Sequence, residues 1–151
     1  MKLLALDLGT TSGYALGVSG AVISGSQSFA NRRFDGGGMR FVRFRTFLAE
    51  LYAATPFERV VYEEVRAHKG VDAAHVYGGL MATLTAWCEE KAIPYEGVPV
   101  GAIKRYATGK GNAKKDAIIA AVSSWGFKPV DDNEADALAL LHLKLAEEFL
   151  A

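Results

Sequence analysis

Three segments carry a carboxylate where the neighbouring residues predict burial. Asp7 closes the apolar run LLALDL, Glu63 stands near the end of VVYEEV, and Asp136 lies in the Ala- and Leu-rich segment DDNEADALALL. A buried carboxylate must be hydrogen-bonded, paired with a cationic side chain or bound to a metal. Carboxylates that converge offer the hard oxygen ligands that Mg²⁺ and Mn²⁺ prefer. Two such ions would activate water and stabilise the leaving oxygen of a phosphodiester.

The second and third segments leave alternatives for the ligands. Side chains alternate along a strand, so Glu63 and Glu64 point to opposite faces of the sheet, and the pattern alone does not choose between them. Asp132 and Asn133 precede Asp136 by four and three residues, so either pair shares one face of a helix. Acids at a helix N-terminus also act as caps and dipole partners, which explains the first acids of DDNEADALALL but not Asp136.

Two basic segments offset an acidic remainder in a chain whose formal net charge is zero. Residues 31–45 carry five arginines and one acid, and residues 101–115 carry four lysines, one arginine and no acid. Basic segments of this kind attract polyanions such as nucleic acids. Solvated helix faces would also explain them, but the glycines inside both segments favour a binding role.

The composition is that of an ordinary soluble protein. Half of the 151 residues are hydrophobic and 23% are charged, which predicts one domain, residues 1–151, with a substantial core. No apolar run approaches the roughly 20 residues that cross a membrane, and the start MKLLALDLG lacks the features of a signal peptide. A single cysteine, Cys88, excludes an internal disulfide and fits a reducing compartment, so we expect a cytoplasmic protein.

The elements that must position the carboxylates follow from hydrophobic periodicity and turn residues. Strands are predicted over 3–8, 14–18, 21–28, 58–65 and 93–100. Helices are predicted over 39–53, 72–91, 113–124 and 133–150, with a basic, glycine-rich loop over 101–112. A meander followed by alternating elements predicts an α/β fold with a mixed five-stranded sheet, in the order βββ-α-β-α-β-α-α, and helices on its faces. The helix over 72–91 carries a stripe of small residues that permits close approach of a sheet, a helix or a second subunit: Ala74, Gly78, Ala82 and Ala86.

Four stretches, in order and at matching spacings, resemble a known family. These are LALDLGTTSGYAL, VVYEEV, PVGAIKRYATGKGNAKKDAI and EADALAL. Together they resemble the RuvC-like Holliday-junction resolvases of the RNase H-like superfamily, particularly the compact phage-type members, over nearly the whole chain. The resemblance implies an RNase H-like fold and a homodimeric endonuclease of a bacterial or phage-infected cell. Such an enzyme cleaves four-way and other branched DNA, using two Mg²⁺ ions per active site, with Mn²⁺ able to substitute.

The resemblance also assigns roles by position. It implies that Asp7, Glu63 and Asp136 are catalytic carboxylates that bind the metal. It also implies that Lys115 is a catalytic lysine. The family's fourth ligand lies three residues before the last aspartate, where this chain has Asn133. Asn133 coordinates through an amide oxygen, more weakly than a carboxylate, and Asp132 is the alternative one residue earlier. Family members also carry an aromatic wedge shortly after the catalytic glutamate, and the equivalent residue here is Arg66. Arginine stacks on a base or binds a phosphate instead, which favours a broader branched-DNA activity.

Lysines and arginines around these motifs are expected to bind the DNA backbone. Lys104 and Lys115 match the family's functional lysines and are expected at the scissile and neighbouring phosphates. Further DNA contacts are expected, besides Arg66, from Lys110, Lys114, Arg105, Arg40 and Arg43. DNA binding through so many cations should depend strongly on salt.

Two other classes of function compete with the nuclease. DLGTTS also resembles the first phosphate-binding motif of sugar kinases and actin-like ATPases, but those proteins need two related domains, and no second phosphate motif is found in this sequence. A non-catalytic relative that only binds branched DNA is the third class, and the presence of Asp7, Glu63 and Asp136 argues against it. The sequence has no Ser-His-Asp set, no metal-binding CxxC and no Walker loop.

Overall fold

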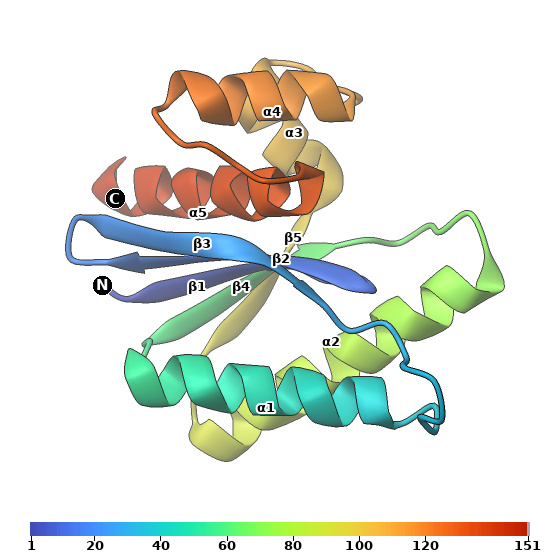
Figure 1. Cartoon of the computed structure of the whole chain (residues 1–151). Helices are drawn as coiled ribbons and strands as arrows, with labels where there is room; N and C mark the ends of the chain where they lie inside the picture. Colours follow the sequence, from blue (N-terminus) through green and yellow to red (C-terminus); the bar gives the residue numbers. More distant parts are fainter. Residues whose placement is uncertain (151) are drawn as a thin grey trace.

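A five-stranded sheet lies between two layers of helices in the computed structural model, which describes residues 1–150 (Figure 1). The strands are β1 (Leu3–Asp7), β2 (Thr11–Val18), β3 (Ala21–Ser28), β4 (Arg59–Glu64) and β5 (Tyr95–Pro99). The helices are α1 (Met39–Ala54), α2 (Val71–Lys91), α3 (Val100–Thr108), α4 (Lys115–Ser124) and α5 (Asp132–Leu150).

The sheet is mixed, with the order β3-β2-β1-β4-β5. Strands β1, β2 and β3 form an antiparallel meander, whereas β4 pairs parallel with β1, and β5 pairs parallel with β4. Because β1 and β4 are parallel neighbours, their carboxyl ends meet at one edge of the sheet. The α/β class, the five-stranded mixed sheet and the helices on both faces are therefore confirmed.

Alternation along β1 and β4 decides which side chains face which helical layer. Leu4 and Leu6 pack with α1 and α2, whereas Leu3 and Ala5 pack with α5. Asp7 continues the series of Leu3 and Ala5 and faces α5. On β4, Val61 belongs to the same core as α5, and Glu63, two residues later, points to that face as well.

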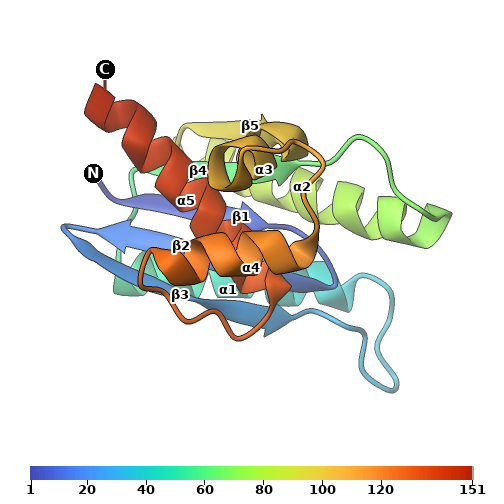
Figure 2. The same cartoon turned by 90° about the horizontal axis from the view of Figure 1, so that it is seen from above.

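Helix α5 is buried on nearly every side. It lies against the sheet, and α3 and α4 pack on its other side (Figure 1). Seen from above, α4 crosses over α5 (Figure 2). This position explains its apolar run, because a helix that packs on both sides needs apolar residues all round. Its buried hydrophobic residues are Ala135, Ala137, Leu138, Ala139, Leu140, Leu141 and Leu143.

The prediction of a loop over residues 101–112 is wrong for its first part, because Val100–Thr108 form helix α3. Ile103 is buried, and Tyr106 packs beside it on the α5 core, so packing on one face stabilises a segment that reads as basic and glycine-rich. Gly109, with φ of +84°, ends the helix by donating its N–H to the carbonyl of Arg105. Residues 1–150 thus form one helix more than the predicted order contains. The other elements are confirmed, with ends that shift by no more than three residues.

The small-residue stripe of α2 does not face the sheet. Ala74, Ala82 and Ala86 are exposed, and a Cβ added at Gly78 would meet no described atom within 4 Å. The close contact with α1 is made by Gly79 instead, where a Cβ would lie 2.4 Å from the ring of Phe41. Separately, no helix within residues 1–150 is long and apolar enough to cross a membrane.

Candidate metal centre and nucleic-acid interface

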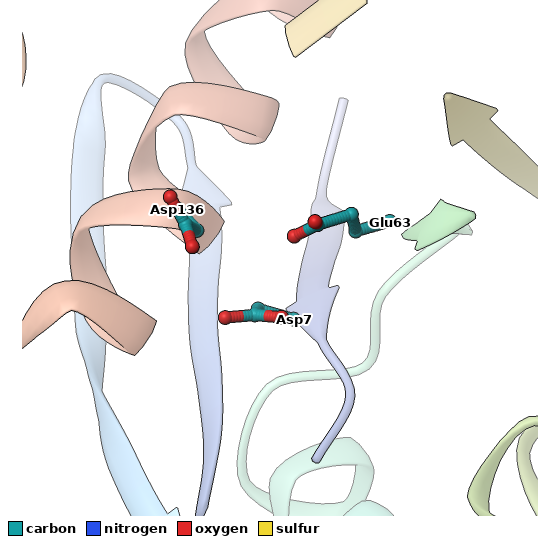
Figure 3. Close-up of side chains that lie close together, drawn as sticks. All are labelled: Asp7, Glu63 and Asp136. Atoms are coloured by element: carbon teal, nitrogen blue, oxygen red, sulfur yellow. The ribbon is translucent and has the colours of Figure 1, made fainter. Parts of the chain in front are cut away.

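Asp7, Glu63 and Asp136 lie together at the edge where β1 and β4 end (Figure 3). One carboxylate oxygen from each lies within 4.8 Å of the others. Asp7 ends β1, Glu63 is the penultimate residue of β4, and Asp136 stands in the second turn of α5. Three residues separated by dozens of positions therefore converge because two parallel strands and one helix meet at this point.

A contact between two backbones holds α5 close to the sheet. Gly13 of β2 is the register partner of Asp7. A Cβ added at Gly13 would lie 1.8 Å from the carbonyl oxygen of Asn133, in the first turn of α5. Real Cβ contacts are never so short. Only a glycine at position 13, next to Asp7 in the sheet, therefore lets α5 approach the sheet this closely.

Hydrogen bonds fix the N-terminus of α5 in this position. Asp131 caps the helix, since its carboxylate accepts the N–H of Glu134 at 2.8 Å. The buried carboxylate of Glu134 accepts the N–H of Val130 at 2.8 Å and the hydroxyl of Ser24, on β3, at 2.6 Å. The expectation that the first acids of this segment act as caps holds for Asp131, while Glu134 ties the helix to the edge of the sheet.

Burial raises the pKa of all three clustered carboxyls, and repulsion from neighbouring acids adds to this for Asp7 and Asp136. The pKa of Asp7 lies well above its ordinary value because the group is buried and because Glu63 and Asp136 stand beside it. The pKa of Asp136 is raised to about 7, by burial first and then by the charges of Glu63 and Asp132. Burial also raises the pKa of Glu63, although the nearby charge of Lys104 opposes this effect. Such a cluster retains protons near neutral pH unless a cation compensates its charge.

The donor set fits a hard divalent cation. All three candidate ligands are carboxylates, with no imidazole or thiolate among them, which is the chemistry that Mg²⁺ and Mn²⁺ prefer over zinc. Burial raises the pKa of all three groups, and neighbouring acids add to this for Asp7 and Asp136, so a bound cation would offset the cost of ionising them together. The residues therefore fit the predicted type of metal.

Glu63 and Glu64, between which the sequence pattern could not choose, have different neighbours in the structure, and so does Asp132, a candidate for the fourth ligand. Glu63 lies in the cluster, whereas Glu64 forms an ion pair with Arg66, with 3.2 Å between Oε1 and Nε. Asp132 is outside the 4.8 Å group, and its carboxylate pairs with the ammonium of Lys115 at 3.2 Å. It is still near enough for its charge to raise the pKa of Asp7 and Asp136.

A cleft of about 580 Å³ opens beside the carboxylates. Four lysines and one of the clustered acids are among its lining residues, which are Lys69, Lys104, Asn112, Ala113, Lys114, Lys115, Asp116, Ile118 and Asp136. Asp136 thus belongs to both the acidic cluster and the basic cleft. Lys69 is the member that the sequence analysis missed. Its position in the loop directly after the Glu63 strand is the signal that could have identified it.

The other predicted DNA-binding residues lie at varying distances from this cleft. Lys110 lines an adjoining cleft with Lys114, and the guanidinium of Arg105 lies near Gly111 in the loop between α3 and α4. Arg66 follows β4 and has an 85% exposed side chain.

The two predicted arginines of α1 are placed differently. Arg43 is 19% exposed and forms an ion pair with Asp35. Arg40 has a buried Nε without a hydrogen-bond partner among residues 1–150. The structure therefore brings the lysines of α3, α4 and the loop between them to the carboxylates, and it leaves the arginines of α1 in the opposite helical layer.

Comparisons with known proteins bear on the fold. No protein-family profile matches the chain, and no curated protein matches its sequence. Among solved structures, Thermus thermophilus RuvC in complex with Holliday junction substrate aligns with a TM-score of 0.77 and 22% identity, over 92% of this chain and 89% of that one. A second structure of Thermus thermophilus RuvC gives a TM-score of 0.73 and 21% identity, over 92% and 90% of the two chains.

A more distant structure shares the same architecture. The yeast mitochondrial Holliday junction resolvase Ydc2 aligns with a TM-score of 0.61 and 12% identity, over 91% of this chain and 74% of that one. The chain therefore has the fold of the RuvC resolvases, and the RNase H-like fold expected from the sequence is confirmed.

Proposed function

On this RuvC-like fold, we propose that the chain is a structure-selective endodeoxyribonuclease that hydrolyses Holliday junctions and other branched DNA with two divalent metal ions. One observation carries the proposal: Asp136 joins a cluster of three carboxylates to a cleft lined by four lysines. Carboxylates bind cations and lysines bind phosphates, so the combination suits a phosphodiester. The likeness in fold to RuvC, which was solved with a Holliday junction substrate, supports the choice of DNA substrate.

The residues divide into a metal-binding set and a phosphate-binding set. Asp7, Glu63 and Asp136 would hold Mg²⁺ or Mn²⁺, with Asp132 or Asn133 as the fourth ligand. Bound in this way, the metal would supply an activated water and neutralise charge at the leaving oxygen. The chain's own part is to gather these ligands on rigid elements, which places the phosphate and the water at fixed positions.

Lys104 and Lys115 are proposed to neutralise the phosphates beside the cluster. Lys104 is close enough to oppose the raised pKa of both Glu63 and Asp136. The ammonium of Lys115 is held by Asp132, which raises its pKa, so the side chain stays protonated at neutral pH. A protonated lysine is an electrostatic catalyst rather than a base, and with 77% of its side chain exposed it has room to meet a phosphate.

The exposed stripe of α2 supports the proposal of a homodimer. A four-way junction has two equivalent strands to cut, and a two-fold dimer presents two equivalent sites. Gly78 and its small neighbours offer a surface that a second helix backbone can approach closely. We further propose that residues 1–151 act as one domain, in the cytoplasm of a bacterium or a phage-infected host.

The nucleotide-binding alternative gains no support from the turn after β1. The hydroxyl of Ser12 donates to the carbonyl of Gly9 at 2.8 Å and accepts its N–H at 3.2 Å. Ser12 is also 1% exposed. The turn therefore uses this hydroxyl to close itself, so Ser12 does not present it to a phosphate.

A cleavage assay tests the proposal. The purified protein is incubated with a labelled four-way junction, a Y-fork or a linear duplex, in Mg²⁺, Mn²⁺ or EDTA. We expect cleavage of the branched substrates with either metal, none in EDTA and little on the duplex. Absence of metal-dependent cleavage on every branched substrate would refute the nuclease, and ATP hydrolysis in parallel tubes would favour the kinase-like class.

A further inference from the structure

Phe34 is a large apolar side chain that lies almost fully in solvent, outside the site described so far. It is 93% exposed and lies in the loop between β3 and α1, directly after the exposed Arg32 and Arg33. A single exposed apolar residue is common and requires no explanation by itself. This one differs because its backbone, its support and its charged neighbours all favour presentation of the ring to a ligand.

The backbone of Phe34 adopts a conformation that suits glycine. Asp35 donates its N–H to the carbonyl of Arg32 at 3.0 Å, which closes a four-residue turn with Phe34 in the third position. The φ angle of Phe34 is +72°, in the left-handed region that bulky residues rarely adopt. Turns with a positive φ at this position usually carry glycine or asparagine. A phenylalanine here is strained and exposed together, which is a combination that clusters at functional sites.

The turn is held firmly in place. The carboxylate of Asp35 accepts the N–H of Arg32 at 2.6 Å and forms an ion pair with Arg43 of α1. These bonds hold the pKa of Asp35 below its usual range, so the carboxylate stays charged and the pair persists. The guanidinium of Arg33 lies 5.0 Å from the centre of the Phe34 ring. The ring is therefore presented on a fixed support with a positive charge beside it.

The loop leaves the molecule at the edge that carries the carboxylates. Phe29, where the loop begins, donates its N–H to the carbonyl of Thr10 at 2.6 Å, and Thr10 follows Asp7 by three residues. The Phe29 ring is buried edge-on against Phe44. Phe34 lies five positions after Phe29, so their Cα atoms are at most about 19 Å apart. Figure 1 shows this loop at the same end of the molecule as the loop that follows β4.

We propose that Phe34 stacks on an unpaired base at the branch point of DNA, while Arg32 and Arg33 bind the flanking phosphates. This inference rests on the proposed DNA substrate and adds a second element of recognition to it. An aromatic ring that directly follows two cations can stack on a base while the cations bind the phosphates beside it. An apolar protein partner would have to bury both arginines with the ring, which costs free energy unless each is paired. The charge around Phe34 therefore favours a nucleic acid.

Two substitutions at this position separate stacking from folding. Phe34→Gly removes the ring and suits the positive φ, so the variant should unfold at a temperature no lower than the parent. Phe34→Tyr keeps an aromatic ring. Phe149→Ala is a matched control, because Phe149 is also 93% exposed but lies near the C-terminal end of α5.

Binding is measured in Ca²⁺ by fluorescence anisotropy, with 2-aminopurine at the branch point as a reporter of stacking. Phe34→Gly should weaken four-way-junction binding about 5- to 150-fold and remove the 2-aminopurine response. Phe34→Tyr should stay within about threefold of the parent, Phe149→Ala should match it, and duplex binding should change less than about twofold. Unchanged junction binding by Phe34→Gly, or an equal loss on duplex and junction, would overturn the inference.

Cleavage assays on the same preparations keep the two proposals apart. If the parent cuts branched DNA and Phe34→Gly binds it as well as the parent, only the stacking inference fails. If the junction binds through Phe34 but is never cut in Mg²⁺ or Mn²⁺, the nuclease fails and the stacking inference stands. If the parent shows neither a 2-aminopurine response nor cleavage, both fail.

Discussion

Gly13 on β2 and Asn133 on α5 approach so closely that a Cβ on residue 13 would lie 1.8 Å from the Asn133 carbonyl oxygen. Gly13 is also the register partner of Asp7 across β1 and β2. The contact therefore determines the distance between α5 and the sheet next to the carboxylate cluster. The distance between Asp7 and Asp136 depends on the absence of one methyl group.

Gly13→Ala should destabilise the fold and weaken metal binding. The new Cβ forces α5 away from the sheet, which should lower the free energy of unfolding by about 1–3 kcal/mol or more. Urea unfolding and calorimetric Mn²⁺ titration measure the two effects. Gly101→Ala in α3 is the control, because its Cβ would meet nothing closer than 3.9 Å and should raise stability by up to about 1 kcal/mol. Wild-type stability and metal affinity in Gly13→Ala would contradict the role given to this contact.

Asp7→Asn should abolish cleavage and leave junction binding within a few-fold of the parent. The substitution removes a candidate ligand at the centre of the cluster, whereas the lysines supply most of the attraction for phosphates. Glu64→Gln is the matched control, because Glu64 pairs with Arg66 outside the cluster and should keep its activity. The reverse outcome, an active Asp7→Asn and an inactive Glu64→Gln, would move the metal site to the other face of β4.

The metal-free protein should lose stability as the pH rises. The carboxyls of Asp7, Glu63 and Asp136 have raised pKa values, so the folded chain binds protons more tightly than the unfolded chain does. The contribution of these three carboxyls to the free energy of unfolding is then largest below the ordinary aspartate pKa, about 4, and it falls as the pH rises through the value of about 7 for Asp136. Thermal unfolding in EDTA between pH 4.5 and 8 measures this slope.

The variant Asp136→Asn is the control for the pH dependence of the stability of the metal-free protein. It removes one of the three crowded charges, so it should flatten the pH dependence and stabilise the metal-free protein at pH 7.5 by on the order of 2 kcal/mol. A melting temperature that rises with pH in EDTA, or an Asp136→Asn variant less stable than the parent at pH 7.5, would contradict the assignment.

Lys69→Ala and Lys114→Ala should each reduce the salt dependence of DNA binding. Both residues line the cleft beside Asp136, and each lysine that contacts a phosphate contributes about one unit to the slope of log K against log salt. Anisotropy titrations over a range of KCl concentrations measure the slope. Lys91→Ala, at the far end of α2, should leave it unchanged. An unaltered slope in both cleft variants would place the DNA elsewhere.

Asp132→Asn should reduce cleavage more than Asn133→Ala. Asp132 carries a full charge and holds Lys115 at 3.2 Å, so its loss affects both a candidate ligand and a phosphate-binding lysine. Cleavage rates measured across a series of Mg²⁺ concentrations separate weaker metal binding from a slower reaction. Parental activity in Asp132→Asn would identify Asn133 as the better candidate for the fourth ligand.

The strands and their carboxylates could be predicted because alternation is a local property. Leu3, Ala5 and Asp7 share a face whatever lies above it, and the same holds for Val61 and Glu63. Which helix covers that face is a long-range property. The approach of α5 depends on Gly13, whose role as a contact point is invisible until β2 and α5 are placed together.

Helix α3 was missed because its stabilising contacts are tertiary. The segment from Val100 to Thr108 contains a glycine and two cations, which predicted a loop. Ile103 and Tyr106 pack on α5, and this burial outweighs the weak helical preference of the residues around them. Pro99 before the helix and Gly109 after it are boundary signals that did favour the correct assignment.

The place of α5 in the chain has a consequence for the newly made protein. Asp7 and Glu63 emerge from the ribosome before Asp136, which lies 73 positions after Glu63 and, at a synthesis rate of about 5–20 residues per second, follows it by about 4–15 seconds. During that interval the α5 face of β1 and β4 has no cover, and the acidic cluster lacks its third carboxylate. Translation therefore delays assembly of the metal centre until the buried helix has been made.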